Sequence, residues 1–407
     1  MASTEDPVYF DNHATTAVDP RVLQAMLPTF ETVYGNPESA HPFGWRARLL
    51  VERARELTSR LIGAATHEIE FTSGATDSIQ RAILDLINFV NLRETKRCHI
   101  ITCTTEHKAT LMACHEAVRL GHDLTVLSTD HEGRLRPEQV IEALRPNTIL
   151  VTLMHANNEI GTLHPIKDIG AALRAKRSDV YFHVDAAQTA GKHPIDVDEM
   201  SIDLLSLSAH KFHGPKGVGA LYARSNPGRR IHLNERHHGT PNVSGIVGLG
   251  AACEIAHIEG AQNLKMMTAQ RDLILDTLEE NFGAFGTNGI HLNGARRDRL
   301  CNSLSLTFDG VDPDELMTAL KEIAYSSASA CTGPTQSHVL KAIGQQTNNP
   351  LLTTVRFGLS RLTRDEDVSF LITRLLTGIA SGSSRGIQTT GAISSAYDGP
   401  LKPIRKN

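Results

Sequence analysis

No apolar stretch of the sequence is long enough to span a bilayer, and the acidic N-terminus, Met1 to Asp6, lacks the apolar core of a signal peptide. The formal net charge is only −4 over 407 residues, so the chain shows no electrostatic signature for nucleic acid or for an anionic membrane. We therefore expect a cytoplasmic protein that binds neither a membrane nor nucleic acid directly.

Residue patterns typical of metal, disulfide and nucleotide sites are also missing. The six cysteines, at positions 98, 103, 114, 253, 301 and 331, include no C-x-x-C pair. In a reducing compartment this spacing favours free thiols over a disulfide framework or a zinc site. The stretch Gly214-Pro215-Lys216-Gly217 does not fit the P-loop pattern, and His237-His238 lacks further ligands at metal-binding spacing. No metal is expected.

The composition that remains is ordinary for a globular protein, with 40% hydrophobic and 21% charged residues. A chain of this length holds two or three domains with ample core. We expect a large domain over residues 21–262, a smaller C-terminal α+β domain over 263–380, and an N-terminal segment, 1–20, that packs with the small domain. Residues 381–407 are rich in Ser, Gly, Thr and basic residues, which predicts a flexible tail.

Strand-like and helix-like segments alternate through the large domain. Short apolar segments predict strands over 68–71, 99–103, 124–127, 148–154, 180–184 and 202–207, with helices over 78–89, 110–120, 137–144 and 166–176 between them. Near-continuous apolar strands in such an order indicate a largely parallel sheet covered on both faces, whose ligands bind at the carboxyl ends of the strands. The small domain is expected to contain a connecting helix over 264–281, strands over 302–308, 322–327 and 354–360, and a helix over 365–379.

A lysine and an aspartate each follow one of these predicted strands. Asp185 comes directly after the strand that ends at Val184, and Lys211 lies four residues after Leu207. Pyridoxal phosphate (PLP) needs such a pair, because a lysine amine forms a Schiff base with its aldehyde and a carboxylate keeps its pyridine nitrogen protonated. Taken singly, the lysine reads as a surface charge and the aspartate as a turn residue, so the interpretation depends on their surroundings.

The segment Phe71 to Asp77 links a strand to a helix and predicts an anion site. Its small residues, including Ala75, let backbone N–H groups converge at a helix N-terminus, and the Thr76 hydroxyl adds a donor. Ser208 and His210, which flank the lysine, could complete a phosphate site. A plain Thr or Ser helix cap is the equally weighted alternative for the segment alone.

Further polar residues follow the neighbouring strands. His107 could stack on a pyridine ring and carry protons, although a structural histidine is the commoner outcome. Asn158 and Gln188 could hydrogen-bond the cofactor or brace a turn. Cys331 lies among small residues that suggest an accessible loop, where a thiol could become a reactive thiolate. Arg356, on a predicted strand, would suit a substrate carboxylate or a structural salt bridge.

Together these stretches resemble the class V, fold-type I cysteine desulfurases of the iron–sulfur and nitrogen-fixation type. The shared segments follow the family's order up to about Ile379 and comprise Tyr9 to Thr16, Tyr34 to Pro37, Phe71 to Asp77, Thr105 to His107, Ala156 to Gly161, His183 to Gln188, Ser208 to Gly217, Asn242 to Gly250, His291 to Gly294, and the segments around Cys331 and Arg356.

The resemblance implies an α/β fold of the type I PLP-dependent transferases, with a mainly parallel seven-stranded sheet, and a homodimer with PLP at its subunit interface. The implied roles are a Schiff base on Lys211, a pyridinium contact from Asp185, ring stacking by His107, and cofactor contacts from Gln188, Asn158 and Ala75. Thr76, Ser208 and His210 would hold the phosphate together with Thr240 of the other subunit. Arg356 would bind the carboxylate of L-cysteine, with Asn158 near the substrate. Cys331 would attack the substrate sulfur, release alanine and carry a persulfide to a sulfur-acceptor protein.

The sequence departs from the family pattern at three places. The stretch before Thr240 is shortened and carries His237-His238 where the family usually has Arg-Ser. The segment after Cys331 is about two residues shorter than in the long-loop form of the family. After Ser78, the usual residues are replaced by Ile79-Gln80-Arg81. Two alternatives therefore stay open: a selenocysteine lyase or another class V PLP lyase, and a partner-dependent sulfur-transfer platform with low activity alone.

Overall fold

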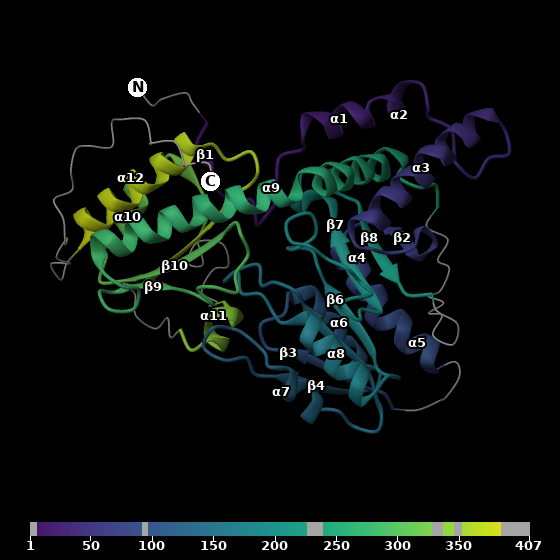
Figure 1. Ribbon diagram of the computed structural model, residues 1–407, viewed down its shortest axis with the longest axis horizontal. Helices are drawn as coiled ribbons and strands as arrows, with labels where there is room; N and C mark the ends of the chain where they lie inside the picture. The colour runs from purple at the N-terminus through teal and green to yellow at the C-terminus, as the bar shows by residue number, and fades with distance from the viewer. Residues whose placement is uncertain (1–5, 92–96, 226–238, 328–336, 346–351, 384–407) are drawn as a thin grey trace. The chain divides into compact units, whose positions relative to one another are not determined.

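The computed structural model describes residues 6–91, 97–225, 239–327, 337–345 and 352–383 (Figure 1). The chain divides into two compact units. The larger unit comprises residues 15–158 and 162–262, and the smaller unit takes the described parts of 1–14, 159–161 and 263–407. The domain boundaries at residues 20, 262 and 380 stay predictions.

A seven-stranded sheet forms the centre of the larger unit. Its strands lie in the order β2 (Ile69–Thr72), β8 (Gly219–Ala223), β7 (Leu204–Ser208), β6 (Tyr181–Asp185), β5 (Thr148–Met154), β3 (His99–Cys103) and β4 (Asp123–Leu127). Strand β8 is antiparallel to both of its neighbours, whereas every other pair in the sheet is parallel. The predicted α/β fold with a mainly parallel seven-stranded sheet is confirmed.

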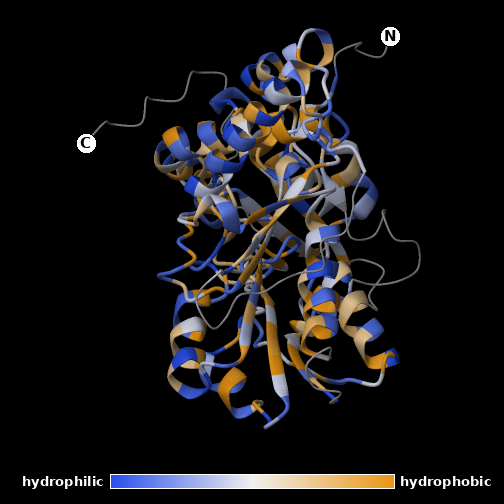
Figure 2. Cartoon of the chain, turned by 90° about the vertical axis from the view of Figure 1, so that its right-hand side faces the viewer, coloured by the Kyte–Doolittle hydropathy of each residue, from blue (hydrophilic) through white to orange (hydrophobic). Residues whose placement is uncertain are grey.

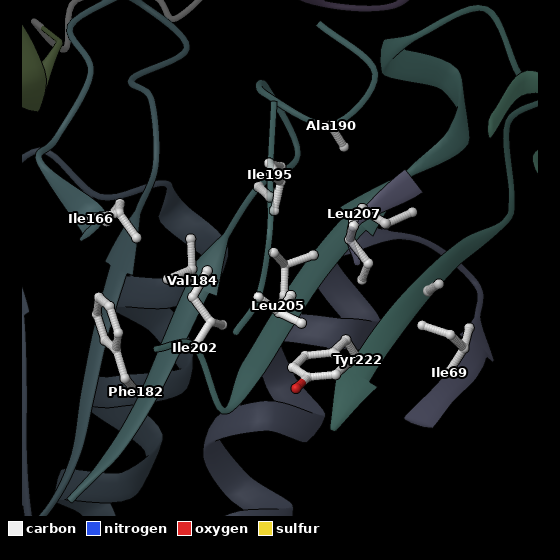
Figure 3. Packing of buried hydrophobic residues seen from close by; sticks show 14 of the residues in the cluster. Ile69, Ile166, Phe182, Val184, Ala190, Ile195, Ile202, Leu205, Leu207 and Tyr222 are labelled. Carbon is white, nitrogen blue, oxygen red and sulfur yellow. The ribbon is translucent and has the colours of Figure 1, made fainter. Parts of the chain in front are cut away.

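Both faces of this sheet are buried, which explains the near-continuous apolar strands. Successive residues of one strand point to opposite faces. Leu205 packs in a cluster with residues of α3 (Pro42–Leu61), α8 (Ile166–Lys176) and the start of α9 (Val243–Phe282). Its neighbour Leu204 packs in a separate cluster with residues of α4 (Ala75–Gln80) and α6 (Lys108–Arg119). Figure 3 shows the first cluster, with Phe182, Val184 and Leu205 side by side on neighbouring strands.

The helices of the larger unit are amphipathic, with blue and orange residues alternating along them in Figure 2. In α8 the buried residues Ile166, Ile169, Gly170 and Leu173 recur at helical spacing. The remaining helices are α1 (Pro20–Met26), α2 (Pro28–Glu31), α5 (Leu86–Asn91) and α7 (Pro137–Glu142), with 3₁₀ turns η1 (Thr66–Glu68) and η3 (Ala209–Lys211) and a π-helical turn η2 (Arg81–Asp85) that joins α4 to α5.

The smaller unit contains a four-stranded antiparallel sheet in the order β12 (Ser326–Ser327), β13 (Leu352–Gly358), β10 (Ser303–Asp309) and β9 (Ile290–Leu292). Strand β1 (Val8–Tyr9) pairs in parallel with β11 (Ile323–Ala324). The C-terminal half of α9, α10 (Pro313–Ala319) and α12 (Asp365–Gly382) supply residues to its core. The short helix α11 (His338–Ala342) contributes to a separate small cluster around Ile160.

Two predicted elements were wrong in extent. The connecting helix begins at Val243 rather than at residue 264, and the strand expected over 322–327 is two strands, β11 and β12, in different sheets. Within the described residues, we find no helix with both the length and the hydropathy needed to cross a membrane.

Candidate active site

Asp185 is the last residue of β6, and its carboxyl group lies inside the larger unit. Because Phe182 and Val184 face α8, the alternation of the strand turns Asp185 toward the face covered by α4 and α6. Its Oδ1 accepts a hydrogen bond of 2.9 Å from the Ala187 N–H. Burial raises the pKa of the Asp185 carboxyl, an effect that the Ala187 N–H, His107 and Lys211 oppose. A cationic partner in the adjacent space would relieve this penalty.

Lys211 ends the 3₁₀ turn η3, immediately after β7. It lines a cavity of about 190 Å³ in the larger unit. The cavity brings together residues that the sequence analysis assigned to one site, namely Ala75, Thr76, His107, Asn158, Asp185, Gln188, Ser208, His210 and Lys211. These residues are separated by up to 136 positions in the sequence, and they meet because each follows a strand at the same edge of the sheet.

The turn between β2 and α4 forms one end of this cavity. Gly74 caps α4 with φ of 148°, a conformation suited to glycine, and a Cβ placed there would lie 3.7 Å from the Ser208 hydroxyl. The Asp77 carboxylate holds the turn by accepting hydrogen bonds from Ser73 N (2.9 Å) and Oγ (3.2 Å). The N-terminus of α4 is therefore fixed beside Ser208, with Thr76 in its first turn.

His210 also lines the cavity and is neutral at physiological pH. Its Nδ1 is 3.1 Å from the Thr15 hydroxyl. Burial, followed by the positive charges of Lys211, Lys216 and Lys192, lowers the pKa of His210 to about 4. At neutral pH the imidazole therefore acts as a neutral hydrogen-bonding group rather than as a cation.

His107 caps the N-terminus of α6 and is oriented by that cap. Its Nδ1 accepts a hydrogen bond of 3.1 Å from Ala109 N, which places the proton of the neutral ring on Nε2. The preceding residue, Glu106, is fully buried and accepts a 2.6 Å hydrogen bond from Met154 N. Burial, with a smaller contribution from the charge of Asp185, raises the pKa of Glu106 to about 8 although the Met154 N–H opposes the shift.

A buried histidine fixes the strands that carry the site. His183 lies two residues before Asp185 and bridges the neighbouring strands, with Nδ1 2.8 Å from Thr152 Oγ1 on β5 and Nε2 2.9 Å from Ser206 Oγ on β7. Burial lowers the pKa of His183 to about 3, so the ring stays neutral. These contacts fix the register of β6 and therefore the position of Asp185.

Three predicted site residues are not among those that line this cavity. Thr240 lines a neighbouring cavity of about 670 Å³ in the same unit, which shares Thr76 with the first. Arg356 belongs to the smaller unit, where its Nη2 donates to Asp11 Oδ1 (3.1 Å) and Ser326 Oγ (2.8 Å). Cys331 lies outside the described residues.

The thiols among the described residues are all buried. Cys103, Cys114 and Cys253 are buried, and burial raises the pKa of each thiol. A buried thiol that stays protonated reacts poorly. Cys331, in a loop that the sequence predicts to be accessible, therefore stays the predicted nucleophile.

Sequence reasoning missed several residues at the cavity. Ile79, Met154, Ala156 and Ala187 line it, and Glu106 lies behind it. Met154 and Ala187 could have been found from position, since each lies at or just beyond the carboxyl end of a predicted strand. Ile79 gave no such signal because an apolar residue on a helix normally indicates core.

The donor set of this cavity fits PLP. A lysine and a buried carboxyl whose pKa is raised meet the needs of an aldehyde and a protonated ring nitrogen. A helix N-terminus, two hydroxyl groups and a neutral imidazole at the other end meet those of a phosphate. The volume is below the roughly 300–1,000 Å³ typical of drug-sized ligands, which suits a single small ring.

Comparison with known proteins identifies the family of this chain. A family model described as aminotransferase class-V matches residues 8–371. The cysteine desulfurase IscS of Anaeromyxobacter dehalogenans (strain 2CP-C) is 45% identical over 377 residues, covering 90% of this chain and 91% of that protein. The solved structure of a NifS-like protein is 34% identical with a TM-score of 0.80, and the match covers 91% of this chain and 98% of the NifS-like chain. The solved structure of SspA in complex with cysteine is 35% identical with a TM-score of 0.73, and the match covers 88% of this chain and 100% of the SspA chain. This chain therefore belongs to the class V aminotransferase family and, within it, to the PLP-dependent cysteine desulfurases.

Proposed function

We propose that this cysteine desulfurase binds PLP in the 190 Å³ cavity of the larger unit and converts L-cysteine to L-alanine, with a persulfide on Cys331. The observation that carries the proposal is the convergence of Lys211 and the buried Asp185 on one small cavity. A solved relative in complex with cysteine supports the choice of substrate.

In this proposal the two ends of the cavity would hold different parts of the cofactor. Asp185 would keep the ring nitrogen protonated, because the cation would compensate the cost of burying the Asp185 carboxylate. His107, oriented by its bond from Ala109 N, would stack on the ring, and Gln188 and Asn158 would donate hydrogen bonds to its oxygen. At the opposite end Ala75, Thr76, Ser208 and His210 surround the phosphate, joined by Thr240 of a second subunit.

The chain's own residues then move the protons and the sulfur. When bound, PLP stabilises negative charge at the substrate Cα. The Lys211 amine would hold the cofactor and, when free, would accept the proton from the substrate Cα. Arg356 binds the substrate carboxylate. The Cys331 thiolate attacks the substrate sulfur, so that an S–S bond forms while the C–S bond breaks. The electron pair of the C–S bond stays with the substrate carbon, which takes up protons to give alanine. The persulfide on Cys331 then passes its outer sulfur to an acceptor thiol.

Replacing Cys331 by serine tests this assignment, with alanine formation from L-cysteine as the measurement. We expect the wild-type protein to be yellow and to form alanine, the Cys331→Ser variant to keep its colour but lose alanine formation, and the Lys211→Ala variant to lose both. Cys253→Ala, which removes a buried thiol, serves as the control. Unchanged alanine formation by the Cys331→Ser variant would contradict the desulfurase assignment and favour a class V lyase.

We also propose that the chain is a homodimer, because the larger unit exposes a group of large apolar side chains on α1, α2, α3 and their connections. We call this group the N-terminal apolar patch; it comprises Leu23, Phe30, Tyr34, Trp45 and Leu49, which are 48%, 63%, 66%, 52% and 69% exposed. Large side chains clustered on one surface mark an interaction site more often than scattered ones do. A second copy of the chain would cover this patch and bring Thr240 to the phosphate site.

Light scattering of the purified protein tests the dimer. Trp45→Glu should shift the mass from dimer to monomer, because a carboxylate in an apolar interface cannot be desolvated without a partner. Met112→Glu, at a residue of α6 that is 67% exposed and lies outside the patch, should leave the mass unchanged. A wild-type monomer would refute the proposal. We place the protein in the cytoplasm and its sulfur acceptor among proteins with a reactive thiol.

A further inference from the structure

A second lysine is buried behind the turn that carries Lys211. Lys192 is only 8% exposed, and its amino group donates a hydrogen bond of 3.2 Å to the backbone carbonyl oxygen of Lys211. A lysine is rarely buried, because an ammonium group that leaves water must gain compensating contacts. The hydrogen bond to the Lys211 carbonyl is one such contact, so the two lysines are coupled through the backbone of η3.

The turn around Lys192 packs closely on the residue after Lys211. Gly191 has φ of +72°, and a Cβ placed there would lie 2.8–2.9 Å from atoms of the Phe212 side chain. Only glycine allows this approach. The turn containing Lys192 and the turn containing Lys211 therefore form one packed assembly.

The same turn is joined to the end of β6, where Asp185 lies. Thr189 N and Ala190 N donate to the carbonyl oxygen of Ala186, at 3.0 and 2.8 Å, and Lys192 N donates to that of Thr189 at 2.9 Å. A short hydrogen-bonded segment thus runs from the residue after Asp185 to Lys192. It connects the carboxyl group of the site to the turn that presents the amine.

The positive charge of Lys192 also reaches the site. Together with Lys211 and Lys216 it contributes to the lowered pKa of His210. The buried ammonium group therefore lies close enough to act electrostatically on a residue that lines the cavity.

We propose that Lys192 is a positioning residue, which holds the η3 turn through the Lys211 carbonyl and thereby presents the Lys211 amine to the cofactor aldehyde. The proposal rests on the proposed function, because it takes Lys211 as the residue that binds PLP. The step it affects is the condensation of the Lys211 amine with the aldehyde, which forms a C=N bond and releases water.

The test follows this condensation in the full-length protein. PLP is added to protein freed of cofactor, samples are reduced with borohydride, and the fraction of chains modified at Lys211 is measured by mass spectrometry over time. The variants are Lys192→Met, which removes the charge and the donor, Lys192→Arg, which keeps both, and Lys216→Met, which removes an exposed positive charge that also influences His210. Steady-state kinetics with L-cysteine and melting temperatures are measured alongside.

We expect Lys192→Met to slow modification of Lys211 and to lower kcat by ~10- to 100-fold, the scale of a misplaced reacting group, with KM for cysteine within about twofold. Lys192→Arg should recover most of the rate, and Lys216→Met should match the wild type. Modification of Lys211 at the wild-type rate in Lys192→Met would overturn the proposal. So would slowed modification in Lys192→Met that persists in Lys192→Arg, provided that the melting temperature shows Lys192→Arg to be folded. If Lys192→Met does not fold, Lys192→Leu takes its place, since it also removes the charge and the donor, and slowed modification of Lys211 is again the expected result.

Modification and turnover separate the two hypotheses. If wild-type protein is modified at Lys211 but forms no alanine from cysteine, the proposed function fails while the role of Lys192 is still decided by the modification rates. If PLP never modifies Lys211, both fail.

Discussion

Glu106 places a carboxyl group in the interior of the larger unit, and replacing it with glutamine should change how stability depends on pH. The side chain is fully buried behind the cavity, and its Oε1 accepts the Met154 N–H. Glutamine keeps an oxygen acceptor for that N–H but cannot ionise. The substitution therefore removes the ionisation of Glu106, and the pH dependence of stability that it causes, while it keeps the acceptor for the Met154 N–H.

The sign and size of the effect follow from the pKa values. An unstructured glutamate ionises near pH 4.5, whereas burial raises the pKa of Glu106 to about 8. The folded protein therefore holds a proton that the unfolded chain releases between these values. Stability supplied by the neutral carboxyl is fully present below about pH 4.5 and is lost as the pH rises through about 8. At about 1.4 kcal/mol per pKa unit, the loss is on the order of 5 kcal/mol.

Urea unfolding of wild type and Glu106→Gln at pH 5, 6, 7, 8 and 9 measures this dependence. We expect the free energy of unfolding of the wild type, relative to the variant, to fall by several kcal/mol across this range and to level off above pH 8. Glu138→Gln, at an exposed residue of α7, should run parallel to the wild type. A constant difference between wild type and Glu106→Gln would refute the reasoning.

Three further variants test other parts of the structure. Asp185→Asn should lower alanine formation by about 100-fold or more, because an amide cannot hold the ring proton, while PLP still attaches; unchanged activity would contradict that role. Arg81→Met should lower the free energy of unfolding by about 3–5 kcal/mol in urea titrations, because the buried Asp85 loses the guanidinium 3.7 Å from it and Glu70 loses a hydrogen bond from Arg81; a second change, Asp85→Leu, should restore the part that is due to Asp85. Arg356→Lys should raise KM for cysteine by about tenfold, since a point charge replaces a planar fork; a change confined to kcat would count against the carboxylate contact.

The alternation of apolar segments predicted six of the seven strands of the larger sheet to within two residues. Strand β8 was missed as a segment because Gly219 to Ala223 is rich in small residues with low strand propensity. The early start of α9 was missed for a similar reason. Glycines in its first turns lower helix propensity, but a Cβ at Gly250 would lie 2.6 Å from the Ala54 Cα, so packing against α3 requires them.

The candidate site could be predicted to the extent that its residues follow strands. Asp185, Lys211 and His107 each lie just past a predicted strand, and the cavity contains all three. Glu106 and Lys192 could not be recognised in this way, because charged side chains near turns normally face solvent. Only tertiary packing showed that both are buried.

The reversed direction of β8 has a consequence for the order in which the protein matures on the ribosome. Within the described residues β2 lies at the edge of its sheet, and β8 is its sole hydrogen-bonded neighbour. Strand β2 is translated early, yet its partner in the sheet is complete only once Ala223 has left the exit tunnel. A nascent chain stalled before that point would pack α4 on the sheet through residues such as Leu204 while β2 still lacked its hydrogen-bonded neighbour.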